Sequence, residues 1–348
     1  MATDLTGGLG DDREYVFATQ PDEPEMRESV NVWAWDNGLD FGFPRIGVEA
    51  VADQWETHDV QVNLAFADGR VYNVFGPGPV HDPVAADGRP AVLGAGPLSF
   101  EIIEPFRHLR MKLDGVAAGT TVQAQIEGRL PGAGAGEVPV RAEIDIRPAA
   151  PPWENGSTSD EARRILSTQE EGWLIGYPWR FEQLCRASGT ITVGGEQHRL
   201  DGGANRIRRQ SIRRLARLWG HVWQAGMFPG GRGFGCIVYP PRDDGKTTYN
   251  EGYVFDGDGA LIPARVLRAP FLRTLTPRRE DVSLVLETAR GTIAIGGETL
   301  ASTFHVMPPE VGGGLQLQQA LARYTWDGES GVGMIERSTT PERLARPG

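Results

Sequence analysis

The sequence predicts an all-β protein of antiparallel strands with few short helices. Hydrophobic residues mostly recur at every second position, as in residues 60–66 and 71–75, and Asp68-Gly69 lies between these two runs. An Asp-Gly turn between alternating runs is a strong signal for a β-hairpin. Glycine and proline contribute 46 and 25 of the 348 residues, which is high for helices and typical of tight turns. Short strands separated by such turns indicate a barrel or a sandwich.

The length predicts two domains, because 348 residues exceed what one ordinary core organises. Proline and glycine are dense at residues 149–157, which makes this segment the best candidate linker. Ser157, Thr158 and Ser159 are candidate caps of a short helix that continues to residue 169. We therefore expect a flexible N-terminus at 1–25, a β domain at 26–150, a linker with a short helix at 151–170 and a second β domain at 171–340.

Strand patterns occur in both halves of the chain. In residues 315–324, Leu-Gln alternation favours a strand while Gln-Gln-Ala-Leu favours a helix, and we expect a strand. Besides the hairpin at 60–75, strands are expected at 98–104, 109–113, 121–130, 138–146, 180–193, 220–228, 249–255 and 315–324.

The charge balance argues against a nucleic-acid-binding protein. Acidic residues number 46 against 35 basic ones, a net charge of -11, whereas nucleic-acid binders usually carry a basic surplus. Cys185 and Cys236 form neither a disulfide framework nor a zinc knuckle, and the histidines are scattered, so we expect no metal and no cofactor. No segment reaches the roughly 18 apolar residues of a membrane helix, and residues 1–12 lack the apolar core of a secretory signal. A cytoplasmic protein without an integral membrane segment is expected, its oligomeric state left open.

Three titratable side chains are candidates for acid–base chemistry. His221 shares a strand face with Trp223, and a histidine beside a tryptophan in an apolar pocket would be a poised acid or base. Glu182 lies in an apolar stretch where burial would raise its pKa. Glu251 shares a face with Tyr253. The alternatives are a histidine satisfied by a core hydrogen bond and a glutamate paired with a nearby arginine.

An arginine-rich segment at 205–224 stands out in an otherwise acidic chain. It could bind a phosphate or a carboxylate, or its arginines could pair with the acidic surplus of the same molecule. The chain also carries nine tryptophans, which could line a pocket for a flat or polyene ligand or simply fill a core. The arginines of the segment are Arg206, Arg208, Arg209, Arg213, Arg214 and Arg217.

Several motifs carry a family resemblance. They are GWLIGYPWRFEQ at 172–183, GHVWQ at 220–224, YPPR at 239–242, YNEGY at 249–253 and YTWDG at 324–328, with looser matches at 32–36 and 54–59. With these motifs the chain resembles the AttH-like, carotenoid 1,2-hydratase (hydroxyneurosporene synthase) superfamily over nearly its whole length.

The resemblance implies two tandem lipocalin-like antiparallel β-barrel domains with a ligand site near their junction. In the hydratases of this superfamily, an acid protonates an alkene and water captures the cation. His221 and Trp223 are the nearest counterparts by position. The sequence has no aspartate beside His221 to complete the acid pair that such hydratases use, and Asp201 and Glu182 are the substitutes.

We therefore expect a cofactor-independent hydratase, isomerase or cyclase that acts on an apolar isoprenoid, polyketide-like or aromatic substrate. His221 would move a proton, helped by Glu182 or Glu251. The alternatives are a non-catalytic lipocalin-type binder or carrier of a hydrophobic small molecule, and an interaction protein that uses the arginine-rich segment. The residues expected to bind the substrate are Trp173, Trp179, Trp223, Tyr253, Arg206 and Arg208.

Overall fold

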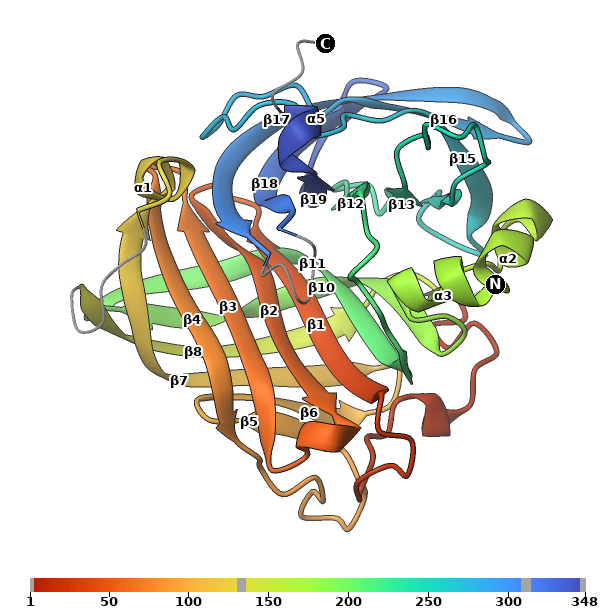
Figure 1. The fold of residues 1–348 in the computed structure, drawn as a ribbon. Helices are drawn as coiled ribbons and strands as arrows, with labels where there is room; N and C mark the ends of the chain where they lie inside the picture. Colours follow the sequence, from red (N-terminus) through yellow and green to blue (C-terminus); the bar gives the residue numbers. More distant parts are fainter. Residues whose placement is uncertain (1–2, 130–135, 308–313, 345–348) are drawn as a thin grey trace.

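The computed structural model describes residues 3–129, 136–307 and 314–344, which form two β-barrels side by side (Figure 1). Every strand pairing in the described ranges is antiparallel, and the helices are short. The expected all-β fold is therefore confirmed. None of the helices in these ranges is both long and apolar enough to cross a membrane.

The first sheet contains the N-terminal strands and two strands from later in the chain. The neighbours run β4-β3-β2-β1-β11-β10-β8-β7-β6-β5, and an additional β4–β7 pairing joins the eight strands from β4 to β7 into a ring. The strands are β1 (Met26–Asp36), β2 (Phe41–Val51), β3 (Thr57–Phe66), β4 (Arg70–Pro79), β5 (Val92–Ala95), β6 (Leu98–Glu104), β7 (His108–Thr121), β8 (Glu137–Pro148), β9 (Trp153–Glu154, paired with β10), β10 (Arg180–Val193) and β11 (Glu196–Ile212).

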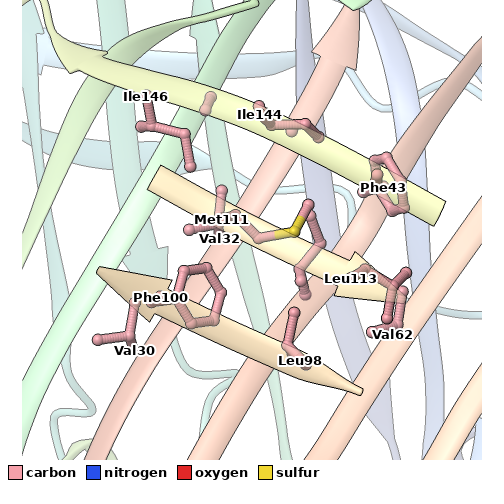
Figure 2. Packing of buried hydrophobic residues seen from close by; sticks show 14 of the residues in the cluster. Val30, Val32, Phe43, Val62, Leu98, Phe100, Met111, Leu113, Ile144 and Ile146 are labelled. Atoms are coloured by element: carbon pink, nitrogen blue, oxygen red, sulfur yellow. The ribbon is translucent and has the colours of Figure 1, made fainter. Parts of the chain in front are cut away.

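Alternate residues of these strands fill the first barrel. Side chains along a strand point to opposite faces in turn, so Val30 and Val32 of β1 point inward while Asn31 points outward. Figure 2 shows Val30 and Val32 packed with Phe100 and Met111 in a buried cluster. The core therefore follows the period of two seen in the sequence.

The second sheet is a closed barrel of eight strands. Its interior holds buried side chains such as Val222, Phe234 and Tyr324. The strand at Gln316–Trp326 confirms the expectation for residues 315–324. The strands are β12 (Gly220–Met227), β13 (Gly233–Val238), β14 (Asn250–Phe255), β15 (Ile262–Arg268), β16 (Leu284–Thr288), β17 (Gly291–Val306), β18 (Gln316–Trp326) and β19 (Glu329–Thr339).

The helices lie mainly in the connections. The start of the helix expected at 159–169 is confirmed, because the Ser159 side chain accepts a hydrogen bond from the Ala162 N–H at the start of α2. The helix ends at Leu166, earlier than expected, and a separate helix begins at Gln169. The strand expected at 121–130 is wrong: β7 ends at Thr121, whose hydroxyl caps α1 in the same way, and residue 130 lies outside the described residues. The helices are α1 (Val122–Ile126), α2 (Asp160–Leu166), α3 (Gln169–Ile175) and α5 (Pro341–Leu344), with 3-10 turns at Asp11–Arg13 and Ala52–Gln54.

Sheet membership changes late in the chain. β10 and β11 pair with β8 and β1, so residues up to Ile212 belong to the first sheet, and the second barrel begins at Gly220. The domain limits expected from the sequence, with a linker at 151–170, stay a prediction, and the pairing favours a later division.

The two barrels pack through the outward faces of β1, β11, β12 and β19. Trp33 of β1 meets Trp223 of β12 with ring centroids 4.3 Å apart. Ile207, Leu184 and Ile237 belong to the same buried cluster. A direct hydrogen bond also crosses between the barrels, because Asn63 Nδ2 donates to Gln319 Oε1 at 2.5 Å. The junction is therefore a second core shared by both sheets.

The N-terminal segment packs against the inner face of β11. Register pairs Arg206 with Val32 and Arg208 with Val30, so both arginines share the face that points into the first ring. Arg206 donates to both carboxylate oxygens of Glu14, at 2.9 and 2.5 Å, and Arg208 pairs with Glu28 at 2.5 Å. Part of the segment expected to be flexible is thus buried.

Replacing Glu14 with alanine should destabilise the protein strongly. The change leaves the Arg206 guanidinium buried without its carboxylate, and breaking a buried ion pair in this way costs about 3 kcal/mol or more. Urea denaturation followed by tryptophan fluorescence measures the difference. The exposed Asp22→Ala is the control, and equal unfolding midpoints for the two variants would contradict the buried pair.

Candidate functional site

Two adjoining cavities lie at the junction of the barrels. The larger has a volume of about 230 Å³ and the smaller about 30 Å³. Both barrels contribute to the shared wall, together with the segment that connects β11 to β12. The residues that line both cavities are Asn31, Arg45, Arg213, Leu218, His221 and Glu336.

His221 and Glu336 form the central polar pair of this wall. Strand β12 lies antiparallel to β19, and register places His221 opposite Ser338 and Trp223 opposite Glu336. His221 Nε2 lies 3.1 Å from Glu336 Oε1, and His221 Nδ1 lies 2.7 Å from the Ser338 hydroxyl. The three side chains thus form a buried carboxylate–imidazole–hydroxyl series. The proton of a neutral His221 in this arrangement sits on Nε2, because only a ring N–H can bond to an ionised carboxylate.

The surroundings of Glu336 keep it ionised. Burial alone would raise the pKa of this carboxyl, but the hydrogen bond from His221 and the charge of Arg45 outweigh burial and hold the pKa well below its usual range. Arg45 Nη1 lies 3.6 Å from Glu336 Oε2, and Gln319 Nε2 donates to the same oxygen at 2.5 Å. Glu336 is therefore a fixed negative charge beside the imidazole.

A chain of amides extends this network into the first barrel. Gln319 Oε1 accepts from Asn63 Nδ2 at 2.5 Å, and Asn63 Oδ1 accepts from Asn73 Nδ2 at 2.7 Å. These bonds fix which atom of the Gln319 amide faces Glu336. The orientation of the catalytic candidates thus depends on both barrels.

His305 adds a second imidazole to the larger cavity. Burial lowers the pKa of His305 to about 4, and the opposing effect of Glu336 does not restore it. This ring is therefore neutral at neutral pH and can both donate and accept hydrogen bonds.

Glu182 lies behind the smaller cavity. Its Oε2 accepts from the Trp223 indole at 2.8 Å and from Asn205 at 3.1 Å, and Arg180 lies 2.8 Å from Oε1. Burial raises the pKa of Glu182, although the charge of Arg180 opposes the effect. Trp223 faces the cavity while Glu182 holds its ring from behind. Of the expected site residues in the described chain, His221 and Trp223 are the ones that line the junction cavities.

Glu251 and Tyr253 lie elsewhere in the second barrel. Glu251 accepts from the N–H groups of Gly156 and Thr158, at 2.6 and 2.8 Å, and from the hydroxyls of Thr158 and Tyr249. Its carboxylate therefore fixes the segment that leads into α2. Tyr253 is buried against Trp153, with centroids 5.3 Å apart. A role of either residue in catalysis or binding stays a prediction.

The other expected substrate-binding residues are dispersed. Trp173 lines a separate surface hollow of about 410 Å³, where the Arg214 guanidinium lies 3.8 Å from its ring centroid. Trp179 is 46% exposed, and the Arg13 guanidinium carbon lies 4.0 Å from its ring centroid. Arg206 and Arg208 point into the first ring. Their contact with a substrate stays a prediction.

The sequence alone did not identify Glu336, Arg45 or Asn31, whereas Arg213 belongs to the arginine-rich segment that could bind a phosphate or a carboxylate. Glu336 lies within β19 (Glu329–Thr339), but its partner His221 is 115 residues earlier in the chain. Local alternation does not reveal which distant strands pair. Knowledge of the β12–β19 pairing would have pointed to Glu336. His221 pairs with Ser338, and Glu336 is two residues from Ser338 on the same face, so the two side chains are diagonal neighbours.

Comparisons with known proteins give a family and a fold. The family described as "Domain of unknown function (DUF7064)" matches residues 11–341. Among curated proteins, none matches the sequence. No group of three or more histidine, cysteine, aspartate or glutamate side chains in the described ranges is placed to hold a metal ion.

Two solved structures share the architecture. An AttH-like protein from Nitrosomonas europaea is 14% identical with a TM-score of 0.55, and the match covers 93% of this chain and 98% of that one. Kievitone hydratase from Nectria haematococca is 10% identical with a TM-score of 0.50, covering 97% of both chains. At these identities the likeness concerns the fold, and the expected AttH-like fold is confirmed.

Replacing Glu251 with alanine should lower stability by about 3 kcal/mol, because two backbone N–H groups and two hydroxyls lose a charged acceptor. Urea denaturation measures this loss. Glu161→Ala, an exposed glutamate on α2, is the control. An unchanged unfolding midpoint for Glu251→Ala would show that the carboxylate does not anchor the segment before α2.

Glu49, which lines the larger cavity, should make stability depend on pH. Burial opposes its ionisation, but the charges of Arg209, Arg213 and Arg27 outweigh burial and lower the pKa of Glu49 to about 2. Because the folded pKa lies below the ordinary value of 4.5, the stabilisation is complete above about pH 5 and is lost as the pH falls toward 2. The free energy of unfolding of wild type should exceed that of Glu49→Gln by about 3 kcal/mol at neutral pH. This difference should become smaller as the pH falls to about 3.

Unfolding free energies from urea titrations at several pH values measure this gap. The exposed Glu56→Gln is the control and should track wild type throughout. A gap between wild type and Glu49→Gln that stays constant down to about pH 3 would mean that Glu49 does not have a depressed pKa.

Proposed function

The chain belongs to the DUF7064 family, and we propose that it is a cofactor-independent enzyme that moves a proton on a small molecule held between its two barrels. The observation that carries the proposal is the His221–Glu336 pair on the shared wall of the junction cavities. A buried imidazole held by an ionised carboxylate is a general acid–base group whose charged form is stabilised at the moment of transfer.

The pair suits a hydratase, an isomerase or a cyclase. In a hydration, the imidazolium of His221 gives its proton to a carbon of the substrate double bond, and water adds to the resulting cation. The added water then loses a proton, which returns His221 to the imidazolium form. Glu336 stabilises the positively charged ring throughout, while Trp223, which lines the smaller cavity, offers an aromatic ring to a developing cation.

The fold supports this choice among acid–base reactions. Kievitone hydratase, which has the same fold, is named as a hydratase. Glu182 enters the proposal as a positioning residue, because its carboxylate holds the Trp223 indole rather than facing the cavity. A hydration, an isomerisation and a cyclisation can each begin with a proton transfer to the substrate, so the site itself does not select one of them.

A non-catalytic binder is the second candidate function. One observation favours it: both ring nitrogens of His221 already have protein partners at hydrogen-bond distance. Proton transfer requires the substrate to take over one of these contacts. In a binder, the same contacts would simply hold the cavity wall in place.

Isotope exchange on the natural ligand separates the two functions. The full chain is purified from its own cells, and native mass spectrometry with extraction identifies the retained small molecule. This molecule is then incubated with the protein in deuterium oxide. An enzyme of the proposed type should place deuterium on carbon, and His221→Gln should slow this incorporation about 100-fold or more, which is typical for loss of a general acid–base group.

His108→Gln is the matched control. His108 also contacts a carboxylate, with Nε2 2.6 Å from Asp145 Oδ1, but on strands β7 and β8 of the first barrel. This variant should exchange deuterium at the wild-type rate. A ligand that binds without deuterium incorporation or product would favour the binder, and full activity of His221→Gln would exclude the proposed role of His221.

A further inference from the structure

Five of the six arginines in the arginine-rich segment form ion pairs with carboxylates, and Arg213 is the sixth. Among the ion pairs of the described residues, each of the five has a carboxylate partner, and none includes Arg213. The pairs are Arg206–Glu14, Arg208–Glu28, Arg209–Glu49, Arg214–Glu25 and Arg217–Glu170. The hypothesis that these arginines neutralise the acidic surplus of the same molecule is thus confirmed for five of the six.

Arg213 lines both junction cavities. Its Nε donates to the Leu174 carbonyl at 3.4 Å, a long and weak hydrogen bond. Burial lowers the pKa of Arg213 to about 10. The charges of Arg45 and Arg180 act in the same direction, whereas the charges of Glu49 and Glu336 oppose the effect without restoring the usual pKa. The guanidinium is still charged at neutral pH, since this pKa lies well above 7.

The carboxylates near Arg213 are already engaged. Glu49 pairs with Arg209 and Arg27, and Glu336 binds His221 and Gln319. The guanidiniums of Arg45, Arg180, Arg209 and Arg213 line the smaller cavity. Three of them have carboxylate partners, which are Glu336 for Arg45, Glu182 for Arg180 and Glu49 for Arg209. Arg213 is therefore the guanidinium of this wall that has no carboxylate partner among the described ion pairs, and a buried charge of this kind is costly unless an anion compensates it.

We propose that the junction cavity binds an organic carboxylate with an apolar body, and that Arg213 pairs with its carboxylate group. A guanidinium presents two parallel N–H groups that match a carboxylate bidentately. Leu218 and Trp223 offer an apolar surface beside Arg213, and Met307 and Leu317 continue it in the larger cavity. The inference shares its site with the proposed function but does not require proton transfer.

Paired probes that differ only in charge test this inference. Isothermal titration calorimetry of the full chain compares 1-naphthoate with its neutral amide, 1-naphthamide. Wild type should bind the carboxylate at least about tenfold tighter, which corresponds to one charge-assisted hydrogen-bonded pair. Arg213→Gln should abolish this preference while its affinity for the amide stays within about twofold, because the apolar surface is unchanged.

Arg214→Gln is the matched control, since its side chain is exposed and pairs with the exposed Glu25. It should keep the wild-type preference for the carboxylate. Equal affinities of wild type for the two probes, a preference that survives Arg213→Gln, or no binding of either probe up to its solubility limit would each overturn the inference.

The acid–base role of His221 and the anion site at Arg213 can be contradicted independently of each other. His221→Gln should retain the preference for naphthoate, because the carboxylate pairs with Arg213. If His221→Gln also keeps full deuterium exchange on the natural ligand, the proposed acid–base role falls while the anion site stands. If exchange is lost in His221→Gln but the charge preference is absent in wild type, the anion site falls and the acid–base role stands.

Discussion

The pairing of β1 with β11 is the constraint on which the rest of the structure depends. It joins Met26–Asp36 to a strand about 170 residues later and closes the first ring. It also fixes which side chains face the second barrel, because a slip of one residue moves every side chain to the opposite face. Asn31 and Arg209 reach the junction for this reason, whereas Arg206 and Arg208 are committed to the interior of the first barrel.

The shared wall of the two cavities is polar, although an apolar cluster packs the barrels together beside it. The first barrel supplies Arg45 and the second supplies His221 and Glu336, while Arg213 lies on the connection between them. Neither barrel holds the complete site. If Arg213 binds a carboxylate as proposed, a substrate with an acidic group, such as a polyketide-like or aromatic acid, fits the site better than a hydrocarbon isoprenoid.

The sequence predicted the features that depend on neighbouring residues in the chain. Alternation located most strands, and Ser159 located the start of α2. Local sequence does not show which distant strands pair, and this is why Glu336 was missed beside His221. The strand wrongly expected at 121–130 has a different origin. Apolar and polar residues alternate in Val122–Ile126, and this pattern suits a short capped helix as well as a strand.

The late position of β11 has a consequence for synthesis on the ribosome. Until β10 and β11 have left the exit tunnel, β1 and β8 each present an edge of unpaired backbone groups, although the other strands of the ring are already available. Such edges pair readily with other chains. While the ribosome adds about 60 residues, from Pro148 to Ile212, the first sheet of the nascent protein therefore stays open. A chaperone that covers its free edges would prevent pairing with other chains during this time.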